Sequence, residues 1–191
     1  MKEDKWTTTK LVATGALAVL RFLTAMLLYV PFLVVSGSVL TGVLPLIIGP
    51  FFLTLTSLVV SQFGAVTLFL LVTFVLNTTL PQIFPVWANL AVVPIIGFVV
   101  DFSYKYLKAK NKVLFSFISG AVYNLIFGSE AIILYFTVGL GGTSVPQAIQ
   151  SPTGYITVLV IMILVGGLTG LLAYWIYQKL AQTNAVKRIQ A

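Results

Sequence analysis

The sequence contains no cysteine, no histidine and little charge of either sign. Without cysteine or histidine it has no disulfide framework, no imidazole or thiolate ligands for haem, copper or zinc, and no histidine-based catalytic triad. Asp and Glu number four in total, which is too few for a two-metal carboxylate site. We therefore expect no metal, no cofactor and no catalytic residue, and we do not expect an enzyme.

Charged residues are also too scarce to cover a water-soluble surface. Only 8% of the 191 residues are charged and 59% are hydrophobic, whereas a soluble domain carries about 25% charged residues. The stretch 22–100 contains no Asp, Glu, Lys or Arg, and a membrane span needs about 20 apolar residues. The composition predicts an all-α membrane protein with a single transmembrane domain over residues 1–191.

Apolar runs bounded by Gly, Pro, Asn and charged residues predict a bundle of six transmembrane helices. The division between the second and third spans stays open, because Gly49-Pro50 is also compatible with the end of a short helix and the start of a longer one. The predicted spans are Leu11–Leu33, Ser38–Val60, Phe63–Leu80, Val86–Tyr104, Val113–Thr137 and Gly154–Gln178.

Basic residues form three clusters: before the first span, between the fourth and fifth spans, and after the sixth. By the positive-inside rule these clusters lie in the cytoplasm, which places both termini inside and the chain in the cell membrane. The net charge of +7 then reflects topology at an anionic leaflet rather than nucleic-acid binding. The clusters are Lys2, Lys5 and Lys10; Lys105, Lys108, Lys110 and Lys112; and Lys179, Lys187 and Arg188.

Three ionisable residues fall inside the predicted spans, where each costs roughly 2.5–3.5 kcal/mol. Asp101 lies near the inner end of the fourth span, and we expect it to pair with Lys105 four residues later. Arg21 lies near the middle of the first span, where an internal ion pair and a ligand contact remain open and snorkelling is disfavoured by depth. Glu130, in the outer half of the fifth span, is the stronger candidate for a binding site.

Amides and aromatic residues accompany Glu130 at similar outer-half depths. An acid, amides and aromatics that converge are typical of a small-molecule pocket, although each amide alone is equally typical of helix-to-helix contacts. Close packing is also the default interpretation of the small-residue stripes Ser116-xxx-Gly120-xxx-Asn124 and Gly166-xxx-Gly170. The predicted substrate-binding residues are Glu130, Asn89, Asn77, Trp87, Gln82, Tyr135, Arg21 and Asn124.

Four segments carry a resemblance to a known family: KLVATGALAVL at 10–20, GVLPLIIGP at 42–50, ANLAVVPIIG at 88–97 and YWIYQK at 174–179. Their order, over nearly the whole chain, resembles the S component of energy-coupling factor (ECF) transporters, the small six-helix membrane subunits that capture vitamins. The resemblance implies an outward-facing pocket, which favours Asn89, Glu130 and the loop 138–153, interpreted as either a lid or a solvated linker. It also implies two kinds of partner, a membrane coupling subunit and two cytoplasmic ATPases.

Two departures from that family bear on partner and ligand. The Ala-xxx-Ala face with which the family's first helix docks is absent, and Thr14-xxx-Ala18 is the nearest substitute, so we expect docking there. The N-terminal histidine of the metal-ion branch is absent too, which favours an organic micronutrient over nickel or cobalt. No P-loop occurs, so energy for uptake must come from a partner or an ion.

The sequence thus favours a substrate-binding subunit for a vitamin or vitamin precursor. A lone acid with amides and aromatics suits a cationic or amine-bearing heteroaromatic, such as a thiamine-related pyrimidine, whereas an acidic vitamin at Arg21 is the opposite case. A stand-alone secondary transporter or channel, with Arg21, Asp101 and Glu130 along one path, and a structural membrane subunit remain alternatives.

Overall fold

The computed structural model describes residues 5–36, 38–79, 86–107, 110–137 and 151–191, and all regular secondary structure in these ranges is helical. Four helices, α1, α4, α5 and α6, are long and apolar enough to cross a membrane. The chain is therefore an all-helical membrane protein. The helices are α1 (Thr8–Ser36), α2 (Ser38–Val60), α3 (Ala65–Asn77), α4 (Val86–Leu107), α5 (Lys112–Thr137), α6 (Pro152–Leu180) and α7 (Asn184–Gln190).

The boundary between the second and third helices lies at residues 61–64. Pro50 stays inside α2, so the alternative division at Gly49-Pro50 is wrong. Ser61 and Gly64 adopt φ angles of 57° and 86°, the left-handed conformation that turns a chain sharply after a helix. The prediction of a third span over 63–80 was too long, because α3 has only 13 residues and extends about 20 Å, against a hydrocarbon core of about 30 Å.

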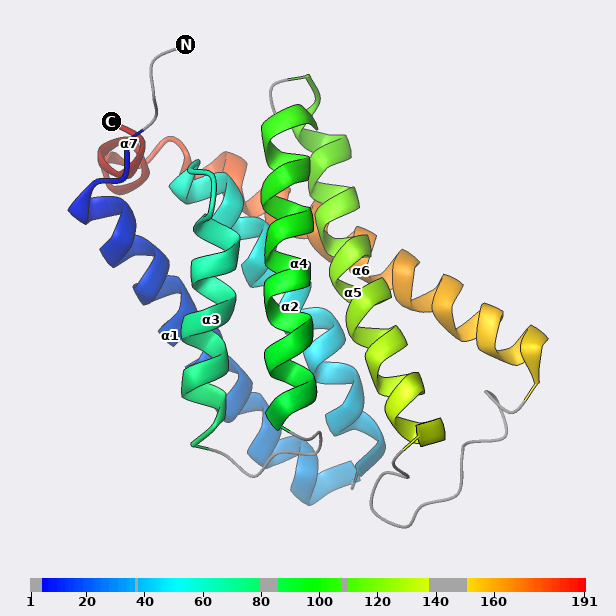
Figure 1. Ribbon diagram of the computed structural model, residues 1–191. Coiled ribbons are helices and arrows are strands. Elements are labelled where there is room, and N and C mark those ends of the chain that lie inside the picture. The colour runs from blue at the N-terminus through cyan, green and yellow to red at the C-terminus, as the bar shows by residue number, and fades with distance from the viewer. Residues whose placement is uncertain (1–4, 37, 80–85, 108–109, 138–150) are drawn as a thin grey trace.

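Helix α2 stands at the centre of the bundle and packs against α1, α3, α5 and α6 (Figure 1). Its residues 52–60 are all buried. Buried hydroxyls in this segment bond within the protein, as the Thr56 hydroxyl donates to the Phe52 carbonyl at 2.7 Å. Around this core, α4 packs against both α3 and α5, and α5 against α6.

Glycines bring α5 and α6 into backbone contact. A Cβ atom at Gly120 would overlap the carbonyl oxygen of Gly166, and one at Gly170 would overlap that of Ser116. Small residues allow this approach of two membrane helices, which gain stability mainly from van der Waals packing and interhelical hydrogen bonds. The close packing predicted from the two small-residue stripes is confirmed.

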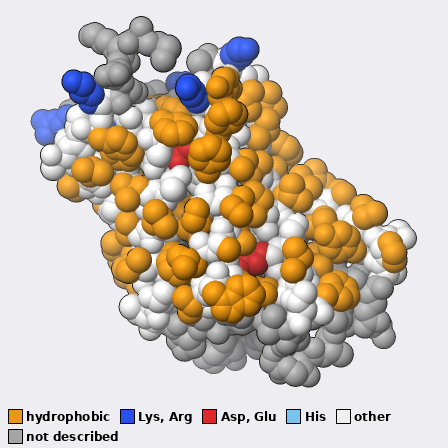
Figure 2. Space-filling view, viewed as in Figure 1, with side chains coloured by type: hydrophobic (Ala, Val, Ile, Leu, Met, Phe, Trp, Pro, Cys, Tyr) orange, Lys and Arg blue, Asp and Glu red, His pale blue; other side chains and the backbone are white. Residues whose placement is uncertain are grey.

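Apart from Arg21, the described basic side chains gather at one end of the molecule. The described N-terminal residues, the connection between α4 and α5, and α7 lie at this end (Figure 1), and the Lys and Arg side chains visible in Figure 2 are found there, above a surface rich in hydrophobic side chains. Lys179 lies 3.9 Å from the ring centroid of Trp175, a contact typical of a membrane interface. This end is called the basic end below.

Candidate binding cavity

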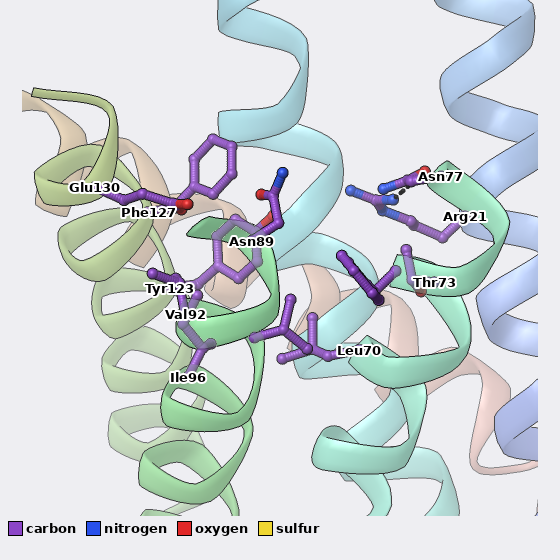
Figure 3. A pocket seen from close by; sticks show the side chains of 12 residues that line it. Arg21, Leu70, Thr73, Asn77, Asn89, Val92, Ile96, Tyr123, Phe127 and Glu130 are labelled. Carbon is purple, nitrogen blue, oxygen red and sulfur yellow. Dashed lines mark hydrogen bonds between the residues drawn. The ribbon is translucent and has the colours of Figure 1, made fainter. Parts of the chain in front are cut away.

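A small cavity of about 60 Å³ opens between α1, α3, α4 and α5 (Figure 3). It lies toward the last turn of α3 and the first turns of α4, in the half of the bundle away from the basic end (Figure 1). Helix α1 contributes Arg21 alone. The other three helices contribute residues about one turn apart: α3 from its last two turns, α4 from its first three, and α5 from its middle and later part. The lining residues are Arg21, Leu70, Thr73, Phe74, Asn77, Asn89, Val92, Val93, Ile96, Tyr123, Phe127 and Glu130.

Arg21 and Asn77 meet on one side of this cavity. The Arg21 Nη1 donates a hydrogen bond of 3.3 Å to Asn77 Oδ1, which joins α1 to the last residue of α3 (Figure 3). The half-buried Arg21 side chain is therefore directed toward α3.

Tyr123 lies between Arg21 and Glu130 (Figure 3), and a glycine in α2 makes room for its ring. A Cβ atom at Gly49 would overlap the Tyr123 ring, so only glycine at that position lets the ring press against the α2 backbone. Tyr123 also stacks on Phe127, with ring centroids 5.7 Å apart and an interplanar angle of 15°. The cavity thus has an aromatic wall.

Two polar groups that line the cavity have no hydrogen-bond partner among the residues that the structure describes. Both carboxylate oxygens of Glu130 and the Thr73 hydroxyl are buried and unpaired, and Glu130 is only 6% exposed. More than 90% of buried polar groups in native proteins are paired, because an unpaired group costs about 1–3 kcal/mol and a charged one more. Unpaired groups on two different helices, α3 and α5, suit a molecule that carries hydrogen-bond donors into this cavity.

The structure brings together four of the predicted site residues: Glu130, Asn89, Asn77 and Arg21. Trp87 lies outside the cavity, 63% exposed on α4. Gln82 lies outside the described residues, as does the side chain of Tyr135 and most of the loop 138–153.

Asn124 is fully buried but does not line the cavity. Its Nδ2 donates to the carbonyls of Leu46 and Met162, both at 3.0 Å, and so connects α5 to α2 and α6. Asn124 therefore joins helices, which is the alternative to ligand binding that the sequence left open for each amide.

Sequence reasoning did not place Tyr123, Phe127 and Thr73 in the site, although a signal for them exists. Tyr123, Phe127 and Glu130 follow each other at spacings of four and three, which puts them on one face of a helix. Thr73 and Asn77 are one turn apart in the same way. Helical periodicity counted from Glu130 and Asn77 would therefore have found these residues.

Asp101 has a different role from the one expected. Its carboxylate is 1% exposed and accepts hydrogen bonds from the backbone N–H groups of Val66 at 3.1 Å and Thr67 at 3.0 Å, and from the Thr67 hydroxyl at 2.7 Å. These groups belong to the first turn of α3, where Gly64 at the N-cap position supplies no side chain. The expected pair with Lys105 is wrong: Asp101 caps α3 from α4, where the helix dipole favours a negative charge.

The two residues expected to dock a partner are inside the molecule. Thr14 and Ala18 are both 0% exposed, and the Thr14 hydroxyl donates to the Lys10 carbonyl at 2.8 Å. The exposed stripe of α1 instead contains Val12, Ala16, Leu23 and Leu27.

Comparison of the chain with family models, curated proteins and solved structures gives no match.

Proposed function

We propose that this chain is the substrate-binding subunit of an ECF-type uptake transporter and captures an organic micronutrient in the cavity between α1, α3, α4 and α5. The observation that carries the proposal is Glu130, a buried carboxylate that has no hydrogen-bond partner in the described part of the chain and lines a cavity with amides and aromatic rings. Such a group favours a ligand with an amine or a cationic ring, which would supply the missing donors.

The other lining groups complete this chemistry. The stacked rings of Tyr123 and Phe127 provide a flat apolar surface for a heteroaromatic ring, and an aromatic face also attracts a cation. Arg21 and the amides of Asn77 and Asn89 offer donors for ring nitrogens or hydroxyls of the ligand. A thiamine-related pyrimidine has both the amine and the acceptors that this set would recognise.

The cavity must widen to take such a molecule whole. Its volume of about 60 Å³ suffices for a few water molecules or one polar group, whereas pockets for small organic ligands enclose roughly 300–1,000 Å³. Pro94 lies in α4 directly after the lining residues Val92 and Val93, and proline removes a helical hydrogen bond and permits a kink. The first turns of α4, including Asn89, are therefore the part that we expect to move.

We further propose that the basic end faces the cytoplasm and that the chain crosses the membrane six times. Helix α2 would form one of the two remaining crossings, and α3 together with the residues on either side of it would form the other. The cavity then opens toward the outside. A membrane coupling subunit and two ATPases would supply the energy, and the stripe of α1 with Val12, Ala16, Leu23 and Leu27 is the accessible surface of the first helix for docking.

Native mass spectrometry of the purified protein, with a vitamin panel that includes thiamine, tests this proposal. We expect one organic ligand to bind tightly without ATP or an ion gradient, and Glu130→Gln to weaken it at least about tenfold, since a hydrogen bond to a charged group contributes about 1.5–3 kcal/mol. Lys105→Gln is the control: it neutralises a charged residue of α4 outside the cavity and should keep the affinity.

Two results would count against the proposal. Unchanged affinity in folded Glu130→Gln protein would remove Glu130 from the site. No binding of any panel member, together with ion-dependent uptake by the isolated protein in liposomes, would favour a stand-alone transporter instead.

A further inference from the structure

An apolar groove runs along the outside of the bundle between α4 and α5. It has a volume of about 630 Å³, and Trp87, Leu125 and Ile133 on its rims are 63%, 38% and 58% exposed. The groove is lined by Trp87, Ala88, Ala91, Val92, Leu125, Ile126, Ser129, Glu130, Ile133, Leu134 and Thr137. Because α4 and α5 are both long enough to span a membrane, the groove faces lipid hydrocarbon.

Glu130 and Val92 line this groove and the polar cavity alike. The two spaces therefore adjoin at Glu130, the one acidic side chain of the groove. A carboxylate beside a lipid-facing surface is costly unless something pairs with it, and within the described residues its two oxygens have no hydrogen-bond partner.

The volumes show how a ligand could use both spaces. The polar cavity, at about 60 Å³, takes only a small polar group, whereas the groove, at about 630 Å³, lies within the range of roughly 300–1,000 Å³ that holds organic ligands. A molecule with a polar head and an apolar arm fits this pair of spaces without any movement of the helices.

We propose that the ligand is a single-chain amphiphile with an amine head, which enters from the bilayer between α4 and α5. Its ammonium group pairs with Glu130, and its hydrocarbon arm lies in the groove. This inference rests on the binding function proposed for the cavity and specifies the class of ligand that it takes.

Charge decides against the ordinary phospholipids of the bilayer as the occupant. The lining of the groove contains no Lys or Arg, so nothing there would neutralise a phosphate, and Glu130 would repel it. An amine head without a phosphate avoids this repulsion and supplies up to three donors to the carboxylate. Trp87 at the rim, with an apolar ring and a polar N–H, suits the boundary between the head and the arm.

Fluorescence of Trp87 provides the test, because the chain has only three tryptophans. In a Trp6→Phe/Trp175→Phe background, the protein is placed in phosphatidylcholine nanodiscs and titrated with 11-bromoundecylamine, whose bromine quenches tryptophan on contact. The alcohol 11-bromoundecanol has the same chain without the charge. We expect saturable quenching by the amine at concentrations at least about tenfold lower than by the alcohol.

Variants locate the binding. Glu130→Gln should remove the preference for the amine, and Ala91→Phe, which fills the groove, should weaken quenching by the amine. Ile95→Phe is the matched control: it adds bulk to the same helix at an exposed residue outside the groove and should leave quenching unchanged. Equal quenching by amine and alcohol in every variant would mean that ordinary lipid chains cover the groove, which overturns the inference.

Thiamine separates this inference from the proposed function. Tight binding of thiamine that depends on Glu130, with no preference for the bromoalkylamine, would keep the vitamin-binding function and overturn the amphiphile. Absence of Glu130-dependent binding of either compound would overturn both.

Discussion

Buried polar side chains in this bundle divide into those with partners and those without. Asp101 accepts three hydrogen bonds and Asn124 donates two, while Glu130 and Thr73 make none with their side chains. The first pair connects helices, and the second pair faces one cavity. An unpaired buried group costs free energy, so the two unpaired side chains at the cavity, Glu130 and Thr73, fit the binding role proposed for it. The Asn124 Oδ1 also has no partner among the described residues, but it lies outside the cavity.

Asn124→Leu tests the structural role of one amide. The change removes the donor to the Leu46 and Met162 carbonyls, and interhelical hydrogen bonds in membranes contribute about 0.6 kcal/mol each on average, so we expect a loss of about 1 kcal/mol in stability. Thermal unfolding in detergent measures it. Asn89→Leu, which alters an amide of the cavity lining, should cost less, and an equal or larger loss there would contradict the division of roles.

At the scale of elements, α3 depends on a cap from another helix. It is the shortest of the six helices that precede α7, and its N-terminal N–H groups end inside the protein rather than in water. Asp101 satisfies two of these groups. Gly97, one turn earlier in α4, lies so close to α3 that a Cβ would come within 2.7 Å of the Thr67 Cα atom, which holds the carboxylate within reach.

Asp101→Ala should therefore destabilise α3 more than any other part of the protein. Loss of an N-cap costs about 0.5–2 kcal/mol, and the buried N–H groups left unpaired raise that cost, so we expect a loss of about 2 kcal/mol. Hydrogen–deuterium exchange at the amides of Val66 and Thr67 should accelerate. Lys105→Ala is the control and should change neither the stability nor the exchange rate. A similar loss of stability in this variant would support the Asp101–Lys105 pair instead.

The contact between α5 and α6 makes a second prediction about elements. Gly120→Ala places a methyl group against the Gly166 carbonyl, so the two backbones must separate, and we expect a loss of about 2 kcal/mol or more in stability. Gly15→Ala is the matched control in α1, because a Cβ at Gly15 meets nothing within 4 Å. It should raise stability slightly through helix propensity, and both changes are measured by thermal unfolding in detergent.

Over the whole molecule, the sequence predicts well what depends on local physics. Hydrocarbon length and the cost of buried charge placed α1, α4, α5 and α6 close to their observed limits, and the spacing of small residues predicted the α5–α6 contact. The partner of Asp101 could not be predicted, because Val66 and Thr67 lie 35 and 34 residues away and only the packing of α3 on α4 brings them near. For the same reason, only the structure shows that Asn89 lines the cavity whereas Asn124 joins helices.

The gathering of basic residues at one end leads to the last prediction, which concerns the orientation of the whole chain. Because the protein has no cysteine, single cysteines can be introduced without a background and labelled in intact cells with a membrane-impermeant maleimide. Cysteine at Asn111, in the connection between α4 and α5, should stay unlabelled until the membrane is permeabilised. Thr79 follows α3 and Ser151 precedes α6, at the ends of these helices that lie away from the basic end. A cysteine at either position should be labelled at once. Labelling of the cysteine at position 111 from outside would mean that the proposed orientation is reversed and that the cavity opens toward the cytoplasm. The proposed capture of an external nutrient would then be wrong as well.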